Sequence, residues 1–262
     1  MRDSNPRPVF LSPHLDDAVL SCGGLIYERA KHGLHPLVIT CFAGAPDYRT
    51  LSPLAAEQHR MWGQPTDPIA HRRGEDAAAM AYLGSHYQHW QYLDCIYRRQ
   101  TDSGVFLYAT EAALFGKVSG DDLGLADQLA ARLARPRSVE GTVFYAPLAV
   151  GHHVDHQILS QTGRVLCSGG YKVMFYEDHP YAEDGDSLAS ALQEWPCALL
   201  PAVHALNEEA LWVKIRAIRC YHSQVGVLFG SEEAVAGRVR SYAAGVGEEG
   251  GAAERYWTED AR

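Results

Sequence analysis

The chain has 262 residues, of which 47% are hydrophobic and 21% are charged. This balance is typical of globular proteins, and the length allows a substantial core. The formal net charge of −9 argues against binding to nucleic acids or anionic membranes, because both need a basic surface. Residues 1–8 contain no apolar stretch of signal-peptide length, and no segment reaches the length of a membrane span. The sequence therefore predicts a cytoplasmic protein without a membrane span.

The six cysteines are far apart, and no two of them form a Cys-x-x-Cys pair. This spacing argues against a cysteine-rich zinc site, and a chain of this size does not depend on a dense set of disulfides. We therefore expect six reduced thiols.

The first part of the chain predicts a strand, a helix and a second strand. Residues 8–12 form the first strand, and the helix runs to about Lys31. Residues 35–42 are almost all apolar, which is typical of a strand in the middle of a parallel sheet. Strand, helix and strand in this order make a βαβ unit.

The rest of the chain continues the alternation of strands and helices. Helices are expected over residues 71–83, 121–133, 158–167, 207–222 and 232–242, and strands over 90–94, 142–147 and 172–177. The proline-rich segment 43–69 is predicted to be an ordered, substrate-facing loop with a short helix around 54–62, while residues 98–120 are not assigned. The pattern predicts an α/β, Rossmann-like three-layer fold with a mostly parallel central sheet and helices on both faces. No internal repeat or linker divides the chain, so we expect a single domain over residues 1–262.

A histidine and two consecutive carboxylates stand where the first strand ends and the first helix begins. They are His14, Asp16 and Asp17. One aspartate here could simply be a helix cap, since carboxylates are favoured at helix N-termini, but capping does not explain two aspartates and a histidine. Histidine and carboxylate both bind zinc, and the second carboxylate can act as a base.

A second polar cluster, containing His152, His153, Asp155 and His156, follows the strand over 142–147 and precedes the next helix. The carboxyl ends of parallel strands lie at one edge of the sheet, where α/β proteins bind ligands. The alternative is that the two clusters are unrelated polar turns. Their common position at strand ends favours one shared site.

The two clusters together predict a catalytic metal site with two imidazoles, one carboxylate and an open position for water. The expected metal ligands are His14, Asp17 and His156. Asp16 would be the general base for a zinc-activated water, and His153, held by Asp155, would stabilise the oxyanion. Ferrous iron suits the same three ligands, so the residue types allow Zn²⁺ or Fe²⁺.

The segments PHLDDAVLSCGG (residues 13–24) and HHVDHQ (residues 152–157) resemble those of the PIG-L/LmbE-like deacetylases. Members of this family are zinc enzymes that remove the acetyl group from N-acetylglucosamine-type sugars. The resemblance extends to Leu93-Asp94 and to the closing segment 253–257, and it implies the same ligands and base as above. Leu15 and Val154 replace prolines that are usual in the family, but neither change removes a chemical group from the site.

Further residues are expected to bind the substrate. The resemblance aligns Arg72 with an arginine that contacts substrate in some members, the alternative being a solvated arginine at a helix start. Asp94, at the end of an expected strand, and His152 are the other candidates for substrate binding. His179 is expected to lie in a surface loop. The residues expected to surround the pocket are Tyr48, Trp62, Tyr92, Tyr97, His152, Glu177, Asp178 and Tyr181.

The sequence as a whole predicts a zinc-dependent N-deacetylase that acts on an N-acetylglucosamine-type amino sugar or its glycoside. A broader zinc amidase acting on a sugar- or thiol-linked conjugate is the second interpretation. The third is a non-catalytic Rossmann-like binding protein, which lacks support because no Gly-x-Gly-x-x-Gly follows the first strand. We expect a small-molecule amino-sugar partner and no nucleic acid, and a homo-oligomer is compatible with the sequence.

Overall fold

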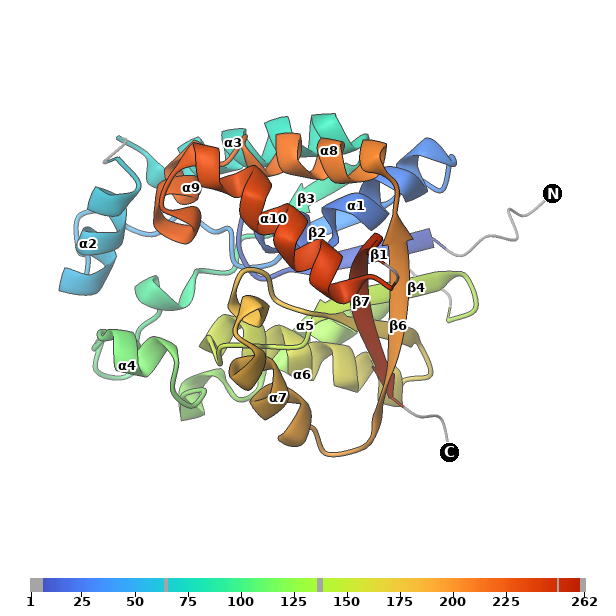
Figure 1. Ribbon diagram of the computed structural model, residues 1–262. Helices are drawn as coiled ribbons and strands as arrows, with labels where there is room; N and C mark the ends of the chain where they lie inside the picture. Colours follow the sequence, from blue (N-terminus) through green and yellow to red (C-terminus); the bar gives the residue numbers. More distant parts are fainter. Residues whose placement is uncertain (1–6, 64–65, 136–138, 249, 260–262) are drawn as a thin grey trace.

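The computed structural model describes residues 7–63, 66–135, 139–248 and 250–259. Its centre is a seven-stranded sheet in the order β3-β2-β1-β4-β5-β7-β6 (Figure 1). The strands are β1 (Arg7–Ser12), β2 (Leu37–Thr40), β3 (His86–His89), β4 (Thr142–Pro147), β5 (Lys172–Tyr176), β6 (Leu199–Leu206) and β7 (Ala252–Glu259). The first five are parallel, and β6 and β7 extend the sheet as antiparallel strands. The order 3-2-1-4-5 is that of a Rossmann-like sheet, so the predicted fold class is confirmed.

Helices cover both faces of this sheet (Figure 1). One face carries α1 (Asp17–Lys31), α3 (Pro68–Leu83), α8 (Glu208–Ile218), α9 (His222–Phe229) and α10 (Glu232–Val246). The other carries α5 (Leu125–Ala134), α6 (Val154–Ser168) and α7 (Gly185–Gln193). Two further helices, α2 (Pro53–Met61) and α4 (Glu111–Leu114), lie beyond the carboxyl ends of the parallel strands. None of the described helices is both long and apolar enough to cross a membrane.

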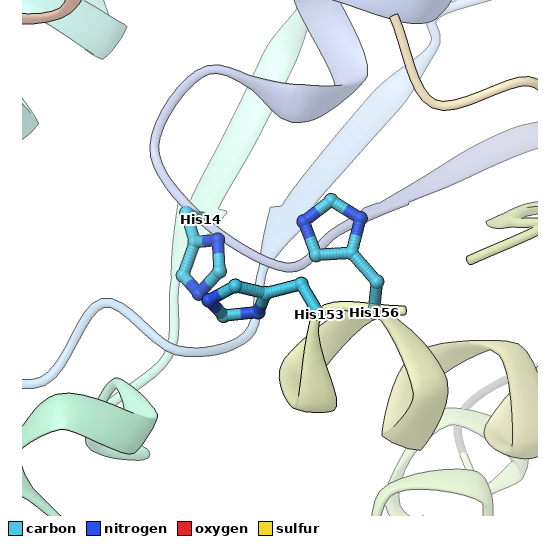
Figure 2. Close-up of side chains that lie close together, drawn as sticks. All are labelled: His14, His153 and His156. Atoms are coloured by element: carbon cyan, nitrogen blue, oxygen red, sulfur yellow. The ribbon is translucent and has the colours of Figure 1, made fainter. Parts of the chain in front are cut away.

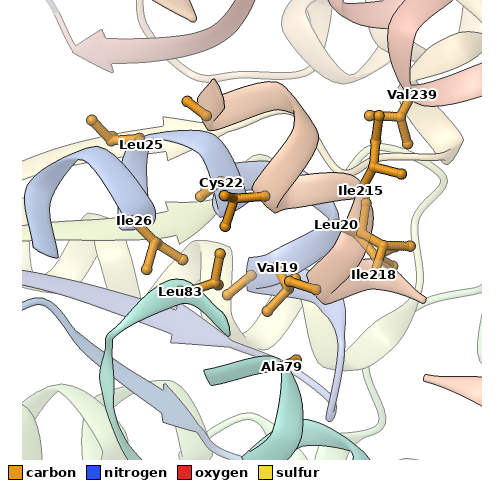
Figure 3. Close-up of a cluster of buried hydrophobic side chains, with 14 of the residues drawn as sticks. Val19, Leu20, Cys22, Leu25, Ile26, Ala79, Leu83, Ile215, Ile218 and Val239 are labelled. Carbon is orange, nitrogen blue, oxygen red and sulfur yellow. The ribbon is translucent and has the colours of Figure 1, made fainter. Parts of the chain in front are cut away.

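The two cores follow from the alternation of side chains along the strands. In β1, Phe10 points into the core shared with α1, α3 and α8, whereas Val9 and Leu11 point into the core shared with α5 and α6. Figure 3 shows the first core, where side chains of α1, α3, α8 and α10 interlock. Both faces of β1 are buried, in keeping with its continuous apolar stretch from Pro8 to Leu11.

A buried ion pair joins this core to the middle of α1. Lys214 Nζ lies 2.7 Å from Glu254 Oε1, and both side chains are buried. Glu254 accepts hydrogen bonds from the backbone N–H groups of Gly24 and Leu25, at 2.9 and 3.0 Å. Lys214 donates to the carbonyl oxygen of Ser21 at 3.1 Å. The pair therefore connects α8 and β7 to α1, the helix that begins at Asp17.

Helix α6 packs unusually close to the sheet at Gly163. A Cβ atom at this position would lie 2.7 Å from Phe175 Cε1 and 2.9 Å from Ala146 Cβ. We therefore expect Gly163→Ala to lower the free energy of unfolding by about 1–3 kcal/mol, the usual cost of overpacking. Gly237→Ala in α10 is the matched control, because no atom lies within 4 Å of its Cβ position. Urea denaturation of both variants measures this, and equal effects would contradict the close packing.

Several predicted boundaries differ from the structure. The third strand is β3 at residues 86–89, not 90–94; residues 91 and 93 make only isolated bridges. Helix α3 begins at Pro68 rather than His71, because the Asp67 side chain caps it by accepting from the backbone N–H of Ala70. Helix α6 begins at Val154, four residues before the predicted start. All six cysteines are free, as expected.

Candidate metal centre

A cavity of about 440 Å³ opens at the carboxyl ends of the parallel strands. It collects residues from both predicted polar clusters, as expected for one shared site. The predicted site residues that line it are His14, Asp16, Asp17, Arg72, Asp94, His153 and His156. Asp155 lies behind this wall, fully buried, and His152 lies outside the cavity lining.

Asp17 lies between the two predicted histidine ligands. Its Oδ2 atom is 3.3 Å from His14 Nδ1 and 3.5 Å from His156 Nε2. Ligand atoms about 2.1 Å from a tetrahedral metal ion are roughly 3.4 Å from one another, so Asp17 is placed to share an ion with either histidine. The three imidazoles of His14, His153 and His156 form the group in which one nitrogen of each lies within 4.8 Å of the others. The backbone N–H of His14 also donates to Asp17 Oδ2 at 2.7 Å and fixes the carboxylate at the start of α1.

A further carboxylate holds the other nitrogen of each histidine. Asp155 Oδ2 lies 2.9 Å from His14 Nε2, and Asp178 Oδ1 lies 2.7 Å from His156 Nδ1. Carboxylate–histidine pairs of this kind orient the imidazoles of metal sites and set their tautomers. In both rings the nitrogen that is not held by the carboxylate is the one that faces Asp17. The donor set therefore fits a metal ion.

His153 completes a group of three imidazoles with His14 and His156 (Figure 2). The centroid of its ring lies 4.9 Å from that of His14 and 5.3 Å from that of His156. Its Nδ1 accepts the backbone N–H of Asp155 at 3.3 Å and so caps α6. Burial, together with His14 and His156, lowers the pKa of His153 to about 3. The ring is therefore neutral, and its proton is on Nε2, which can donate a hydrogen bond.

The charges around Asp17 and His14, two of the three predicted ligands, favour a cation. Burial alone would raise the pKa of Asp17, but His156 and His14 outweigh it and hold that pKa well below its usual value. Burial would likewise lower the pKa of His14, yet Asp94, Asp155 and Asp17 raise it. A metal ion bound in place of the imidazole proton would be attracted by the same carboxylates.

Asp16 has an environment different from that of its neighbour. Burial and the charge of Asp17 raise the pKa of Asp16 to about 7, against the opposing effect of Arg72. Arg72 Nη2 lies 3.4 Å from Asp16 Oδ2, and the guanidinium stacks 4.6 Å from the Trp62 ring centre. Arg72 is thus buried beside the site, so the alternative of a solvated helix-start arginine is wrong. A carboxylate with a pKa near neutrality suits a general base.

The structure corrects the predicted contact of Asp155. Its carboxylate does not hold His153 but His14, and Oδ2 also accepts the backbone N–H of Cys95 at 3.0 Å. The second oxygen, Oδ1, pairs with Arg98, whose guanidinium is buried. Sequence reasoning missed Arg98, because it belongs to the segment 98–120 for which no structure was predicted.

Other side chains also lie elsewhere than predicted. His152 has a φ of 63° directly after Gly151 at 86°, and this turn directs its ring toward Glu194, 3.7 Å away. His179 is buried and lines the cavity, so its prediction as a surface histidine is wrong. Among the other residues expected to surround the pocket, only two line the cavity, namely Trp62 and Tyr181. Glu177 instead accepts hydrogen bonds from Tyr242 of α10 and Trp257 of β7.

Comparison with protein families supports the resemblance inferred from the two clusters. Residues 9–167 match the family described as PIG-L: GlcNAc-PI de-N-acetylase. The chain belongs to the PIG-L family. The matched range contains His14, Asp16 and Asp17 as well as the cluster at residues 152–156, so the predicted family is confirmed.

Named relatives of this PIG-L chain are deacetylases. The 2'-N-acetylparomamine deacetylase of Niallia circulans is 29% identical over 237 residues, which are 86% of this chain and 82% of the relative. The structure of the zinc-inhibited form of the teicoplanin deacetylase Orf2 is 31% identical, with a TM-score of 0.84 over 98% of this chain and all of that one. The A40926 pseudoaglycone deacetylase Dbv21 is 28% identical, with a TM-score of 0.73 and 97% of each chain covered. The predicted deacetylase class is therefore confirmed, and the ligand cluster supports a metal cofactor.

Proposed function

We propose that this chain is a zinc-dependent N-deacetylase for an N-acetylglucosamine-type amino sugar carried as a glycoside. One observation carries the proposal. His14 and His156 are each held by a carboxylate at one nitrogen, and both turn the other nitrogen toward Asp17. Metal-ligating histidines are commonly held in this way, so the arrangement supports a metal site at these residues. The deacetylase relatives support the same reaction, and their names support a glycoside substrate.

The metal ligands would be His14, Asp17 and His156, with Asp155 and Asp178 fixing the imidazoles. When bound, a zinc ion supplies Lewis acidity for the acetyl carbonyl and for a water molecule. Three protein ligands would leave one position for water, as in catalytic rather than structural zinc sites.

Asp16 would accept a proton from the attacking water and return it to the sugar nitrogen as the carbon–nitrogen bond breaks. The products are acetate and a free amine. His153 would donate its Nε2–H to the acetyl oxygen, which gains negative charge during the attack. Arg72 would hold the Asp16 carboxylate in place and, with Asp94 across the cavity, contact the sugar.

The proposal is tested by elemental analysis of the purified protein together with an assay of acetate release. We expect zinc or iron at one ion per chain, and acetate from N-acetylglucosamine glycosides. His156→Ala should lose both the metal and the activity, because it removes one of three ligands. The control is His32→Ala, an exposed histidine at the end of α1, which should lose neither. Full activity of the metal-free His156→Ala protein would overturn the proposal.

A further inference from the structure

A second cavity, of about 310 Å³, lies at the amino ends of the parallel strands, away from the candidate metal centre. Pro8 near the start of β1, Val143 near the start of β4 and Lys172 at the start of β5 all line this amino-end cavity. Leu25 and Arg29 of α1 form another wall. The volume lies at the lower end of the range for small-molecule sites. The proposed reaction makes no use of this end of the sheet.

The floor of the amino-end cavity consists of packed side chains of the sheet. Tyr145 is only 8% exposed and stacks on Phe10, with 4.3 Å between the ring centroids and 14° between the ring planes. The ring of Tyr256 lies edge-on to that of Tyr145, at a centroid distance of 5.5 Å. Both tyrosines line the cavity together with Met174. Because packed aromatic rings hold one another in place, the floor is already formed without a ligand.

The charges that line the amino-end cavity are all of one sign. Arg29 and Lys172 carry a positive charge and His204 can take one up, whereas no aspartate or glutamate lines the cavity in the part of the chain that the structure describes. The nearby carboxylate of Glu28 is already held, since its Oε2 lies 2.6 Å from His204 Nε2. The whole chain has 32 acidic and only 23 basic residues, so composition does not explain a cavity lined by basic groups alone. The local charge favours an anion.

Arg29 and Lys172 also lack the carboxylate partners that neighbouring basic residues have. Lys31, on the same helix as Arg29, pairs with Glu209. Among the described residues, neither Arg29 nor Lys172 forms an ion pair, and the recorded partner of Arg29 is the Tyr145 hydroxyl. A guanidinium has five N–H donors, so one bond to a hydroxyl leaves donors for a ligand. Their planar arrangement matches the oxygen atoms of a carboxylate or phosphate group.

The rest of the lining is mostly apolar. Leu25, Leu34, Val143, Met174 and Val203 lie around the basic groups. Val203 is 46% exposed, and Val143 and Met174 are only partly buried although they face the first core. An inorganic anion would leave these side chains in water, whereas an apolar group attached to the anion would cover them.

We propose that the amino-end cavity binds a small organic anion, with the charged group against Arg29 and Lys172 and the apolar body against the sheet. This site would be separate from the metal centre. Asp17 is the first residue of α1 and Arg29 lies near its end, so the two are about 18 Å apart along the helix axis at about 1.5 Å per residue. The inference does not depend on the proposed deacetylase function.

The test is isothermal titration calorimetry of the whole protein with octanoate, octylammonium and acetate at one ionic strength. Octylammonium has the apolar chain with the opposite charge, and acetate has the charge with almost no apolar body. We expect the Kd for octanoate to be about tenfold or more below that for either of the others, because only octanoate satisfies both parts of the cavity. Equal affinity for octanoate and octylammonium, or for octanoate and acetate, would overturn the proposal, and so would the absence of octanoate binding.

Substitutions place the octanoate in this cavity. Arg29→Gln should raise its Kd about tenfold or more, and Lys172→Gln about two- to fivefold, since Lys172 is exposed. Lys117→Gln is the matched control, because it removes the charge of an exposed lysine that does not line the cavity. His156→Ala should leave octanoate binding unchanged, because a carboxylate bound to the metal centre would lose its site in that variant. An unchanged Kd in Arg29→Gln, or octanoate binding that is lost in His156→Ala, would overturn the assignment.

Discussion

Asp16→Asn is expected to lower kcat by roughly 100- to 10,000-fold, the range that a general base contributes, while the protein keeps its metal ion. Asparagine has nearly the same shape but cannot take a proton from water. The Asp16 carboxylate pairs with Arg72, whereas the Asp17 carboxylate is the one that faces His14 and His156. Acetate release and elemental analysis on the same sample measure the two effects separately.

Asp17→Asn gives the opposite pattern and serves as the comparison. The Asp17 carboxylate is the group that faces both His14 Nδ1 and His156 Nε2, so its loss should remove the metal ion and the activity together. Excess zinc should then restore part of the activity of Asp17→Asn but none of that of Asp16→Asn. A metal-free Asp16→Asn protein beside a metal-loaded Asp17→Asn protein would show that the two roles are reversed.

The strands that the sequence predicts correctly are those whose two faces are both buried. Residues 8–12, 142–147 and 172–177 are almost continuously apolar, because cores on both faces of the sheet cover them. The sequence pattern predicts the third strand four residues too late, because His86–His89 forms an edge strand of polar, mostly exposed residues without an apolar pattern. Strands β6 and β7 were not predicted at all. Many residues of β6 are exposed, and its partner β7 is more than forty residues away in the chain.

Some of the site residues could likewise be predicted from the sequence, and others could not. His14, Asp17 and His156 could be found because they lie where β1 leads into α1 and β4 leads into α6, and β1 pairs with β4 in the sheet. The groups that orient them could not be assigned, because they come from elsewhere in the chain. Asp178 was expected at the pocket rim but instead holds His156. Arg98 acts through Asp155 from a segment that has no regular pattern. Contacts of this kind depend on tertiary structure rather than on local spacing.

Lys214→Met is expected to lower the free energy of unfolding by about 3–5 kcal/mol, the cost of leaving one member of a buried ion pair without its partner. Methionine fills most of the volume of the lysine stem but leaves the Glu254 carboxylate buried among Gly24 and Leu25. Gly23 of α1 shows how tightly the lysine stem is packed. A Cβ at Gly23 would lie 3.0 Å from Lys214 Cγ. Urea denaturation measures the loss, and Lys31→Met, which breaks the exposed pair with Glu209, should have a much smaller effect.

The same ion pair predicts the direction of a pH effect. Burial alone would raise the pKa of Glu254, but Lys214 and hydrogen bonds outweigh it and hold that pKa below its usual value of 4.5. The unfolded chain therefore binds this proton first as the pH falls, so the contribution of Glu254 to stability is present above pH 4.5 and is lost below it. Glu254→Gln should flatten this part of the pH dependence of the unfolding free energy, and Lys214→Met should weaken it. An unchanged slope below pH 4.5 in both variants would mean that Glu254 is not held ionised by Lys214 in the folded protein.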